Sequence, residues 1–245
     1  MSDQKPTVVL VHGAFAESAG WNGVIQRLYA ESITSVAVAN PLRSLAGDAA
    51  YVRDIIASVE GPVVLVGHSY GGLVVSEASA GNDQVAALVY VCAFVPEPGD
   101  SAFSLAASEP GSTLGEAVDA HPISIGGVEL VIRRSVFRDQ FAADVSPEVA
   151  GLMGATQRPV TEAALKDGLQ ASAPGWRDRP SWHLIGTEDR NIPAAVQRAG
   201  AERAKSRGTH EVAGGSHALH VSQPEKVADV IAEAVRTVAE ERAAA

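Results

Sequence analysis

Short apolar runs alternate with amphipathic segments along the first part of the chain. The runs occupy residues 7–11, 33–39, 63–66 and 85–95. Unbroken runs of this kind, rich in valine, are typical of strands that are buried on both faces of a sheet. Between them, apolar residues recur at every third or fourth position, as in residues 52–59, which is the spacing of one helix face. The alternation predicts an α/β fold in which helices cover both faces of a sheet.

Residues 96–180 break this alternation. They contain a predicted hairpin at residues 123–132, which turns at two adjacent glycines, and short helical patterns after it. A stretch of roughly eighty residues is too long for a simple crossover between strands. It also holds few large apolar residues with which to build an independent domain. We therefore expect a mainly helical cap at residues 96–180, inserted into a core made of residues 1–95 and 181–245.

The strand and helix pattern resumes after the cap. Strands are predicted at residues 181–185 and 209–212, and helices at residues 194–205 and 224–241. With these elements the predicted sheet is mostly parallel and has about six strands.

A glycine-rich turn follows the predicted strand at residues 63–66. It reads Gly67-His68-Ser69-Tyr70-Gly71, the pattern G-x-S-x-G. Between a strand and a helix, this pattern places the serine on a sharp, strained turn with its Oγ clear of the sheet. The serine also lies at a helix N-terminus, where free N–H groups favour negative charge. Ser69 is therefore the candidate nucleophile, and it requires a base, an acid and an oxyanion hole.

The candidate base is His217. It lies in Gly214-Gly215-Ser216-His217, a loop between the last predicted strand and the terminal helix. In open α/β sheets such groups collect at the carboxyl ends of strands. His220 is the alternative, but it lies three residues closer to the helix and is expected to be a neighbouring surface or packing residue.

The candidate acid is Asp189, the third residue after the glycine that follows the strand at residues 181–185. Glu188 is adjacent but would point elsewhere, and Glu97 and Asp100, after the preceding strand, are the alternative position. Asp189 is preferred because the order serine, aspartate, histidine is the chain order of hydrolases built on this turn.

An oxyanion hole needs two N–H groups directed at the developing negative charge. One is expected from Tyr70, directly after the nucleophile. The other is expected from Ala14, in the loop that follows the first predicted strand.

Charge and composition limit the choice of partners. The chain of 245 residues has 29 acidic and 19 basic side chains and a net charge of −10. This balance argues against binding to nucleic acid or to an anionic membrane surface. The longest apolar run, residues 85–95, is shorter than the ~20 residues of a membrane helix. A small, neutral or hydrophobic substrate fits better.

Cysteine and glycine usage bear on compartment and cofactors. The single cysteine, Cys92, cannot form an internal disulfide, and the chain starts with polar residues, so we expect a cytoplasmic location. No Cys/His cluster has metal-ligand spacing, and no Gly-rich dinucleotide fingerprint is present. We therefore expect neither a metal nor another cofactor.

The sequence resembles the α/β-hydrolase superfamily over nearly its whole length. The matching motifs are Val9-Leu10-Val11-His12-Gly13 with Trp21, Gly67-His68-Ser69-Tyr70-Gly71-Gly72, Gly186-Thr187-Glu188-Asp189 with Ile192-Pro193, and Gly215-Ser216-His217 with Gln223-Pro224-Glu225. The short cap and Ala93-Phe94-Val95-Pro96 look like the branch of bacterial esterases related to plant methylesterases and hydroxynitrile lyases. The resemblance implies the α/β-hydrolase fold, with Ser69 as nucleophile, Asp189 as acid and His217 as base.

These residues predict a serine hydrolase that cleaves a small carboxylic ester or related acyl bond through an acyl-enzyme. A hydroxynitrile lyase of that branch carries lysine directly after the histidine, where this chain has Ala218, so a lyase role is disfavoured. Two alternatives stay open: a ligand-binding or signalling protein with little turnover, and cofactor-free perhydrolysis.

The substrate pocket is expected between the cap and the nucleophile. The large apolar candidates for its lining are Phe15, Phe103, Leu105, Phe137, Leu152, Met153 and Trp176. We expect them to set the acyl and alcohol preference.

Overall fold

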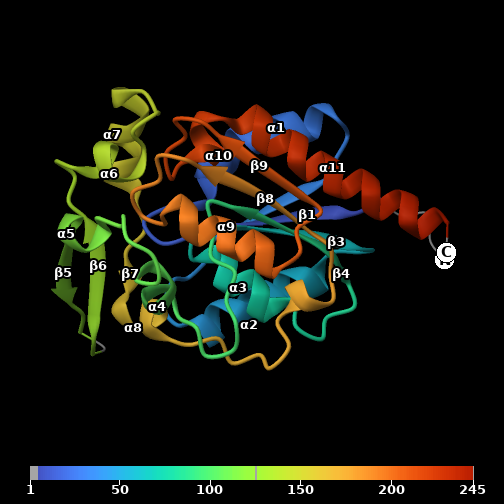
Figure 1. Cartoon of the computed structure of the whole chain (residues 1–245), viewed down its shortest axis with the longest axis horizontal. Coiled ribbons are helices and arrows are strands. Elements are labelled where there is room, and N and C mark those ends of the chain that lie inside the picture. Colours follow the sequence, from blue (N-terminus) through green and yellow to red (C-terminus); the bar gives the residue numbers. More distant parts are fainter. Residues whose placement is uncertain (1–4, 125, 245) are drawn as a thin grey trace.

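The computed structural model describes residues 5–124 and 126–244 and has a six-stranded parallel sheet at its centre (Figure 1). The strand order is β2-β1-β3-β4-β8-β9, and every neighbouring pair is parallel. The strands are β1 (Thr7–Val11), β2 (Ser35–Val38), β3 (Val63–His68), β4 (Val85–Val91), β8 (Ser181–Gly186) and β9 (Gly208–Val212). The predicted sheet of about six strands is confirmed.

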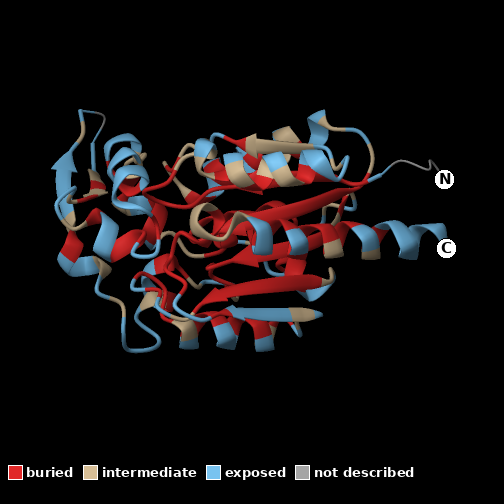
Figure 2. Ribbon diagram, turned by 90° about the horizontal axis from the view of Figure 1, so that it is seen from above, coloured by how far each residue is buried: buried red, intermediate tan, exposed pale blue. Residues whose placement is uncertain are grey.

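Helices cover both faces of this sheet (Figures 1 and 2). Their bounds are α1 (Asn22–Ala30), α2 (Leu45–Ser58), α3 (Gly71–Ala78), α9 (Ala194–Arg203), α10 (Leu219–Ser222) and α11 (Pro224–Ala243). Successive side chains of a strand point to opposite faces. Val64 and Val66 of β3 pack in one cluster with residues of α1 and α11, whereas Val63 and Leu65 pack in another with residues of α2 and α3. This explains why Val63–Val66 of β3 are apolar on both faces of the sheet.

The segment between β4 and β8 forms a cap at the carboxyl ends of the strands (Figure 1). Its elements are α4 (Ala102–Ala106), α5 (Leu114–Ala117), β5 (Val118–Pro122), β6 (Val128–Ile132), α6 (Phe137–Phe141), α7 (Pro147–Thr156), β7 (Val160–Thr161) and α8 (Glu162–Lys166). The three strands form an antiparallel sheet in the order β5-β6-β7. Figure 2 shows that the hairpin end of the cap is exposed.

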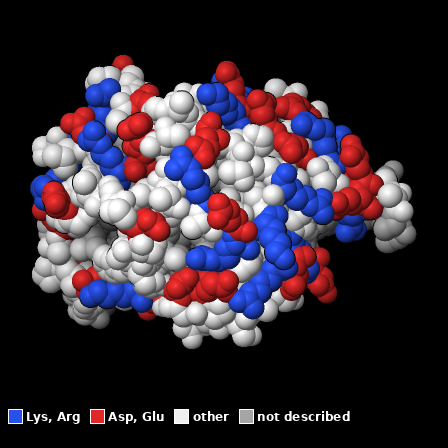
Figure 3. All heavy atoms as spheres, viewed as in Figure 1, with Lys and Arg blue, Asp and Glu red and all other residues white. Residues whose placement is uncertain are grey.

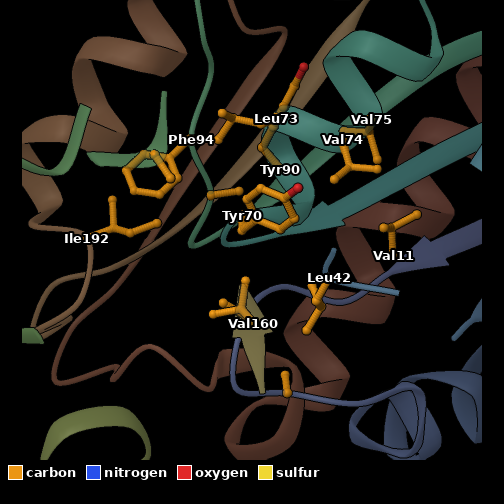
Figure 4. Close-up of a cluster of buried hydrophobic side chains, with 14 of the residues drawn as sticks. Val11, Leu42, Tyr70, Leu73, Val74, Val75, Tyr90, Phe94, Val160 and Ile192 are labelled. Carbon is orange, nitrogen blue, oxygen red and sulfur yellow. The ribbon is translucent and has the colours of Figure 1, made fainter. Parts of the chain in front are cut away.

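The cap shares its buried side chains with the core. Val160 and Phe137 of the cap belong to the same buried cluster as Tyr70 and Val11 of the core. Figure 4 shows Val160 and Leu42 beside Tyr70 in this cluster. The cap is therefore packed continuously onto the sheet.

Several predicted boundaries differ from the structure by a few residues, and two of the larger differences have a clear cause. The hairpin begins at Val118, five residues before the predicted start, because β5 pairs from Val118 to Pro122 with β6. Strand β4 ends at Val91, although the apolar run continues to Val95. The next residue, Cys92, has a φ of 45°, in the left-handed region that ends an extended strand.

The surface carries both signs of charge. Figure 3 shows acidic and basic side chains next to one another over α9 and α11. Arg198 of α9, for example, forms two hydrogen bonds of 2.7 Å with Glu211 of β9. Among residues 5–124 and 126–244, no helix is long and apolar enough to cross a membrane.

Candidate active site

The candidate site lies where the strand order of the sheet reverses. From β1 the chain goes outward to β2 and then returns to the other side of β1 as β3. The loops that follow β1 and β3 therefore meet at one edge, which is where ligands bind in open α/β sheets. A Cβ on Gly13, in the first loop, would lie 2.5 Å from Ser69 Cβ and 3.0 Å from Ser69 Oγ. The two loops are thus in direct contact.

Ser69 has the strained backbone expected of the turn between β3 and α3. Its φ is 58°, in the left-handed region. The glycines around it stand where other residues would collide: a Cβ on Gly67 would lie 2.7 Å from Gly71 O, and one on Gly71 would lie 2.6 Å from Val11 O. The turn can therefore be this tight only with glycine at both positions.

Asp189 and His217 form a buried hydrogen-bonded pair. His217 Nδ1 lies 2.7 Å from Asp189 Oδ2, and both side chains are at most 1% exposed. The other contacts of the carboxylate are donors too: Asn191 N and Ile192 N donate to Oδ1, and Gln197 Nε2 donates to Oδ2. Because the carboxylate oxygen Oδ2 accepts the hydrogen bond from the histidine, the proton of the neutral ring is on Nδ1. His217 Nε2 is then free to accept a proton.

Ser69 and His217 line the same cavity, which has a volume of about 50 Å³. No hydrogen bond joins their side chains in the part of the chain that the structure describes. Such contacts are often loose in unliganded enzymes. The cavity is otherwise apolar, and its lining residues are Ala14, Phe15, Ser69, Tyr70, Phe94, Ala102, Phe103, Ala106, Leu114, Leu165, Asn191, Ile192 and His217.

The two candidate oxyanion donors also border this cavity. Ala14 and Tyr70 both line it, and within residues 5–124 and 126–244 neither backbone N–H has an acceptor. The Tyr70 side chain points away into the core (Figure 4), where its hydroxyl donates to Asp48 Oδ2 at 2.9 Å. The two N–H groups are thus available to a ligand in the cavity.

The alternative base, His220, occupies a different environment. Its ring is fully buried between Trp21 and His68, at centroid distances of 4.8 and 4.2 Å. Neither ring nitrogen has a hydrogen-bond partner among the described residues, and burial lowers its pKa to about 3. His220 does not line the cavity with Ser69. The sequence predicted either a surface residue or a packing residue at this position, and His220 is a packing residue in the core.

The alternative acids, Glu97 and Asp100, are also elsewhere. Glu97 is ion-paired with Arg177, and Asp100 accepts a hydrogen bond of 2.9 Å from the Glu97 amide. Neither residue lines the cavity. Their carboxylates therefore organise the chain after β4.

The structure places some of the predicted pocket residues in the cavity wall and others elsewhere. Phe15 and Phe103 line the cavity, but Phe137, Met153 and Trp176 do not. Phe137 is stacked on Phe141, with ring centroids 5.2 Å apart. Trp176 is buried and donates from Nε1 to Pro96 O at 2.8 Å.

Met153, Leu105 and Leu152 also lie outside the cavity, each in a different environment. Met153 borders a separate groove on α7. Leu105 is buried in the core, and Leu152 is 63% exposed on α7.

The predictions missed several residues of the site. Asn191 and Ile192 line the cavity and also bind Asp189 through their backbone, which their place directly after the candidate acid could have suggested. Gln197 lies eight residues after Asp189, on α9, and has no such signal. Leu114 and Leu165 come from the cap, whose path no local pattern determines.

The cap is hydrogen-bonded to both candidate loops. Gln140 of α6 donates to Asn191 Oδ1 at 2.7 Å and to Arg190 O at 3.0 Å, next to Asp189. Asp144 accepts a hydrogen bond from Ser216, the residue before His217. The position of the cap is thus coupled to the positions of the acid and the base.

Burial keeps three other titratable groups near the site neutral. Burial lowers the pKa of His12 to about 4 and that of His68 well below its usual value. Burial raises the pKa of the Cys92 thiol, whose Sγ lies 3.7 Å from Ser216 O. Cys92 therefore remains a protonated core residue, as its apolar surroundings in the sequence predict.

The described residues hold no group of three or more His, Cys, Asp or Glu side chains that could bind a metal ion.

Comparison with known proteins identifies the family. A family model described as the alpha/beta hydrolase family matches residues 8–230. The chain belongs to this family. Two curated relatives of this alpha/beta hydrolase are a pyrethroid hydrolase from Sphingobium wenxiniae, 28% identical over 96% of this chain and 89% of that protein, and alpha/beta hydrolase nvfD from Aspergillus novofumigatus, 28% identical over 79% and 82%.

Solved structures show the same fold. The crystal structure of polyneuridine aldehyde esterase superposes with a TM-score of 0.79, at 18% identity, over 94% of this chain and 99% of that one. A plant methylesterase from Arabidopsis gives the same TM-score over 95% and 99%. These likenesses show that the fold extends over nearly the whole chain.

Proposed function

We propose that this alpha/beta hydrolase is a serine esterase that cleaves a small carboxylic ester, or a related acyl bond, through an acyl-enzyme. The observation that carries the proposal is the buried hydrogen bond of 2.7 Å between His217 and Asp189, in the wall of a cavity that Ser69 also lines. A protein that only binds a ligand needs neither an oriented base nor a buried carboxylate beside it.

Acylation follows from these positions. As Ser69 Oγ attacks the ester carbonyl carbon, its proton passes to His217 Nε2, because Nδ1 is held by Asp189. The negative charge that develops on the carbonyl oxygen is received by the N–H groups of Ala14 and Tyr70. When the tetrahedral intermediate collapses, the bond to the alcohol breaks and His217 returns the proton to the alcohol oxygen.

Deacylation uses the same groups. A water molecule loses its proton to His217 Nε2 and attacks the acyl carbon, and the new oxyanion is again stabilised by the two amides. The bond to Ser69 Oγ then breaks, and His217 returns the proton to Ser69. The carboxylic acid product is released, and Ser69 and His217 return to their starting states.

Two further observations support an ester as substrate. The cavity is lined mainly by apolar side chains, and its lining contains no Lys or Arg that would select an anionic substrate. The curated relative that aligns with nearly the whole chain is named a pyrethroid hydrolase.

The test is hydrolysis of p-nitrophenyl esters by the wild type and by Ser69→Ala. We expect the wild type to turn over and the variant to lose about 10³-fold or more in kcat. Ser58→Ala, at the exposed end of α2, is the matched control and should retain full activity. Equal rates for the wild type and Ser69→Ala would contradict the proposal.

A further inference from the structure

A second hollow lies beside the candidate active site. It is a groove of about 440 Å³ between the loop after β1 and helix α7 of the cap. Its lining residues are Phe15, Ala16, Glu17, Ala19, Gly20, Asn22, Gly23, Val149, Leu152, Met153, Thr156, Gln157, His220 and Val221.

Phe15 is shared by the groove and the cavity. It lines both hollows and is itself only 2% exposed. It also directly follows Ala14, the candidate oxyanion donor, and has a φ of 60°, which is costly for a bulky residue. A strained aromatic side chain is therefore held between the two spaces, next to the point where an ester carbonyl would bind.

The cavity of Ser69 is much smaller than the groove. It has a volume of about 50 Å³, whereas the groove has about 440 Å³, so the larger group of an ester has more room in the groove. An ester has a group on each side of the reacting bond. If one fills the cavity, the other must extend into a neighbouring space.

The groove has the chemistry of a site for an apolar group. On the α7 side, Val149 is 39% exposed and Leu152 is 63% exposed, and both line the groove beside Met153. Exposed apolar side chains that gather at one concave surface commonly mark a binding site. Glu17 is the only Asp, Glu, Lys or Arg in the lining. The groove thus favours an uncharged, apolar occupant.

We propose that the groove binds the larger of the two groups of the ester and that Phe15, which separates it from the cavity, determines specificity. This inference rests on the proposed esterase function and narrows its substrate class to esters that combine one short group with one long apolar group. A second protein or a second copy of this chain would also cover an apolar groove. The substrate is preferred because the groove adjoins the cavity of Ser69 at Phe15, which lines both.

The test compares two series of esters hydrolysed by the same enzyme. In one series the acyl chain grows from two to ten carbons while the alcohol stays short, and in the other the alcohol grows while the acyl group stays acetyl. We expect kcat/KM to rise with chain length in one series and to fall beyond the shortest members in the other. Equal length dependence in both series would overturn the inference.

Two variants address the groove directly. Leu152→Asp places a charge in the exposed apolar wall and should lower the ratio of kcat/KM for long to short esters about tenfold or more. Phe15→Ala removes the side chain between the two spaces and should raise this ratio. Tyr29→Asp, at a position that is 82% exposed on α1 and outside the groove, is the control and should leave the ratio unchanged.

The outcomes separate the two proposals. Loss of short-ester hydrolysis in Ser69→Ala supports the esterase function whatever the length dependence. If that loss is seen but the ratio in Leu152→Asp equals that in Tyr29→Asp, the groove does not bind substrate and the inference is wrong. Since Leu152 is exposed, this result does not depend on whether Phe15→Ala folds. A wild type inert on both series would overturn both proposals.

Discussion

The ring of His68 is hydrogen-bonded to the backbone of His217. His68 Nε2 lies 2.9 Å from His217 O, and both residues are buried. Since a carbonyl oxygen can only accept, Nε2 carries the proton and donates. The residue directly before the candidate nucleophile therefore holds the loop that carries the candidate base. This contact connects the ends of β3 and β9 within the site.

Removal of this hydrogen bond should lower turnover. In His68→Leu the His217 carbonyl loses its donor, and a small displacement of the base reduces kcat by about 10- to 100-fold. His68→Gln is the matched control, because its Nε2 is as many bonds from the backbone and can donate to the same oxygen. We expect Gln to retain most of the activity. Equal kcat values for the two variants, measured on a short ester, would show that the contact has no positioning role.

The site of Asp189 requires a group that only accepts hydrogen bonds. Its two oxygens face the donors of His217, Gln197 and two backbone amides. Asp189→Asn replaces one oxygen by an NH₂ group that must face donors, which leaves the wrong tautomer of His217 and unsatisfied buried groups. We expect kcat to fall by about 10³- to 10⁴-fold, and the free energy of unfolding to fall by about 1–3 kcal/mol.

The adjacent Glu188→Gln is the control for this prediction. Glu188 is exposed and does not line the cavity. Steady-state kinetics and urea unfolding of both variants make the comparison. Similar losses in the two variants would argue against Asp189 as the acid.

Replacement of Gly13 should lower activity, because Gly13 contacts the turn between β3 and α3 that carries Ser69. A Cβ there would lie 2.5 Å from Ser69 Cβ and 2.7 Å from the backbone oxygen of His68. Gly13→Ala therefore forces the loop after β1 away from Ser69 and misplaces the Ala14 amide, and we expect kcat to fall by about 10²-fold.

A second glycine provides a control in which alanine should stabilise the protein and leave its activity unchanged. Gly151, inside α7, has no atom within 4 Å of an added Cβ. Gly151→Ala should keep its activity and raise the free energy of unfolding by about 0.5–1 kcal/mol, because alanine loses less backbone entropy in a helix. Activity assays and thermal unfolding of the two variants distinguish these effects. An active Gly13→Ala variant would contradict the model of the oxyanion loop.

The parts of the molecule that sequence predicted well have local causes. Strand β3 is apolar on both faces, and the glycines at positions 67 and 71 are required by backbone contacts within the turn. Ser69, Asp189 and His217 each follow a strand of the predicted sheet, so topology alone directs them to one edge. The structure places His217 beside Asp189 and lines one cavity with His217 and Ser69.

The cap could not be predicted in the same way because long-range packing determines it. Phe137 and Trp176 are at least as large as Phe103, which lines the cavity. They are buried elsewhere, because Phe137 stacks on Phe141 and Trp176 donates a hydrogen bond to Pro96 O. The end of β4 has a similar explanation. Composition favours a strand up to Val95, whereas the backbone turns at Cys92 to bring the chain toward the cap.

Buried His183 should make stability depend on pH. It lies in β8, stacked on Tyr90 at a centroid distance of 4.9 Å, and burial lowers its pKa to about 3. In the unfolded chain a histidine titrates near ~6.5. As the pH falls below this value, the unfolded chain binds a proton that the native protein excludes. Stability is therefore lost as the pH falls from about 6.5 toward 3.

Replacement of His183 should make the free energy of unfolding less dependent on pH. His183→Phe keeps the aromatic stacking but binds no proton, so between pH 7 and pH 5 it should lose about 2 kcal/mol less unfolding free energy than the wild type. His121→Gln, at an exposed position in β5, should show the wild-type dependence. Urea unfolding of the three proteins at the two pH values gives the six free energies of unfolding required. Parallel losses in His183→Phe and the wild type would mean that His183 takes up a proton in the native protein.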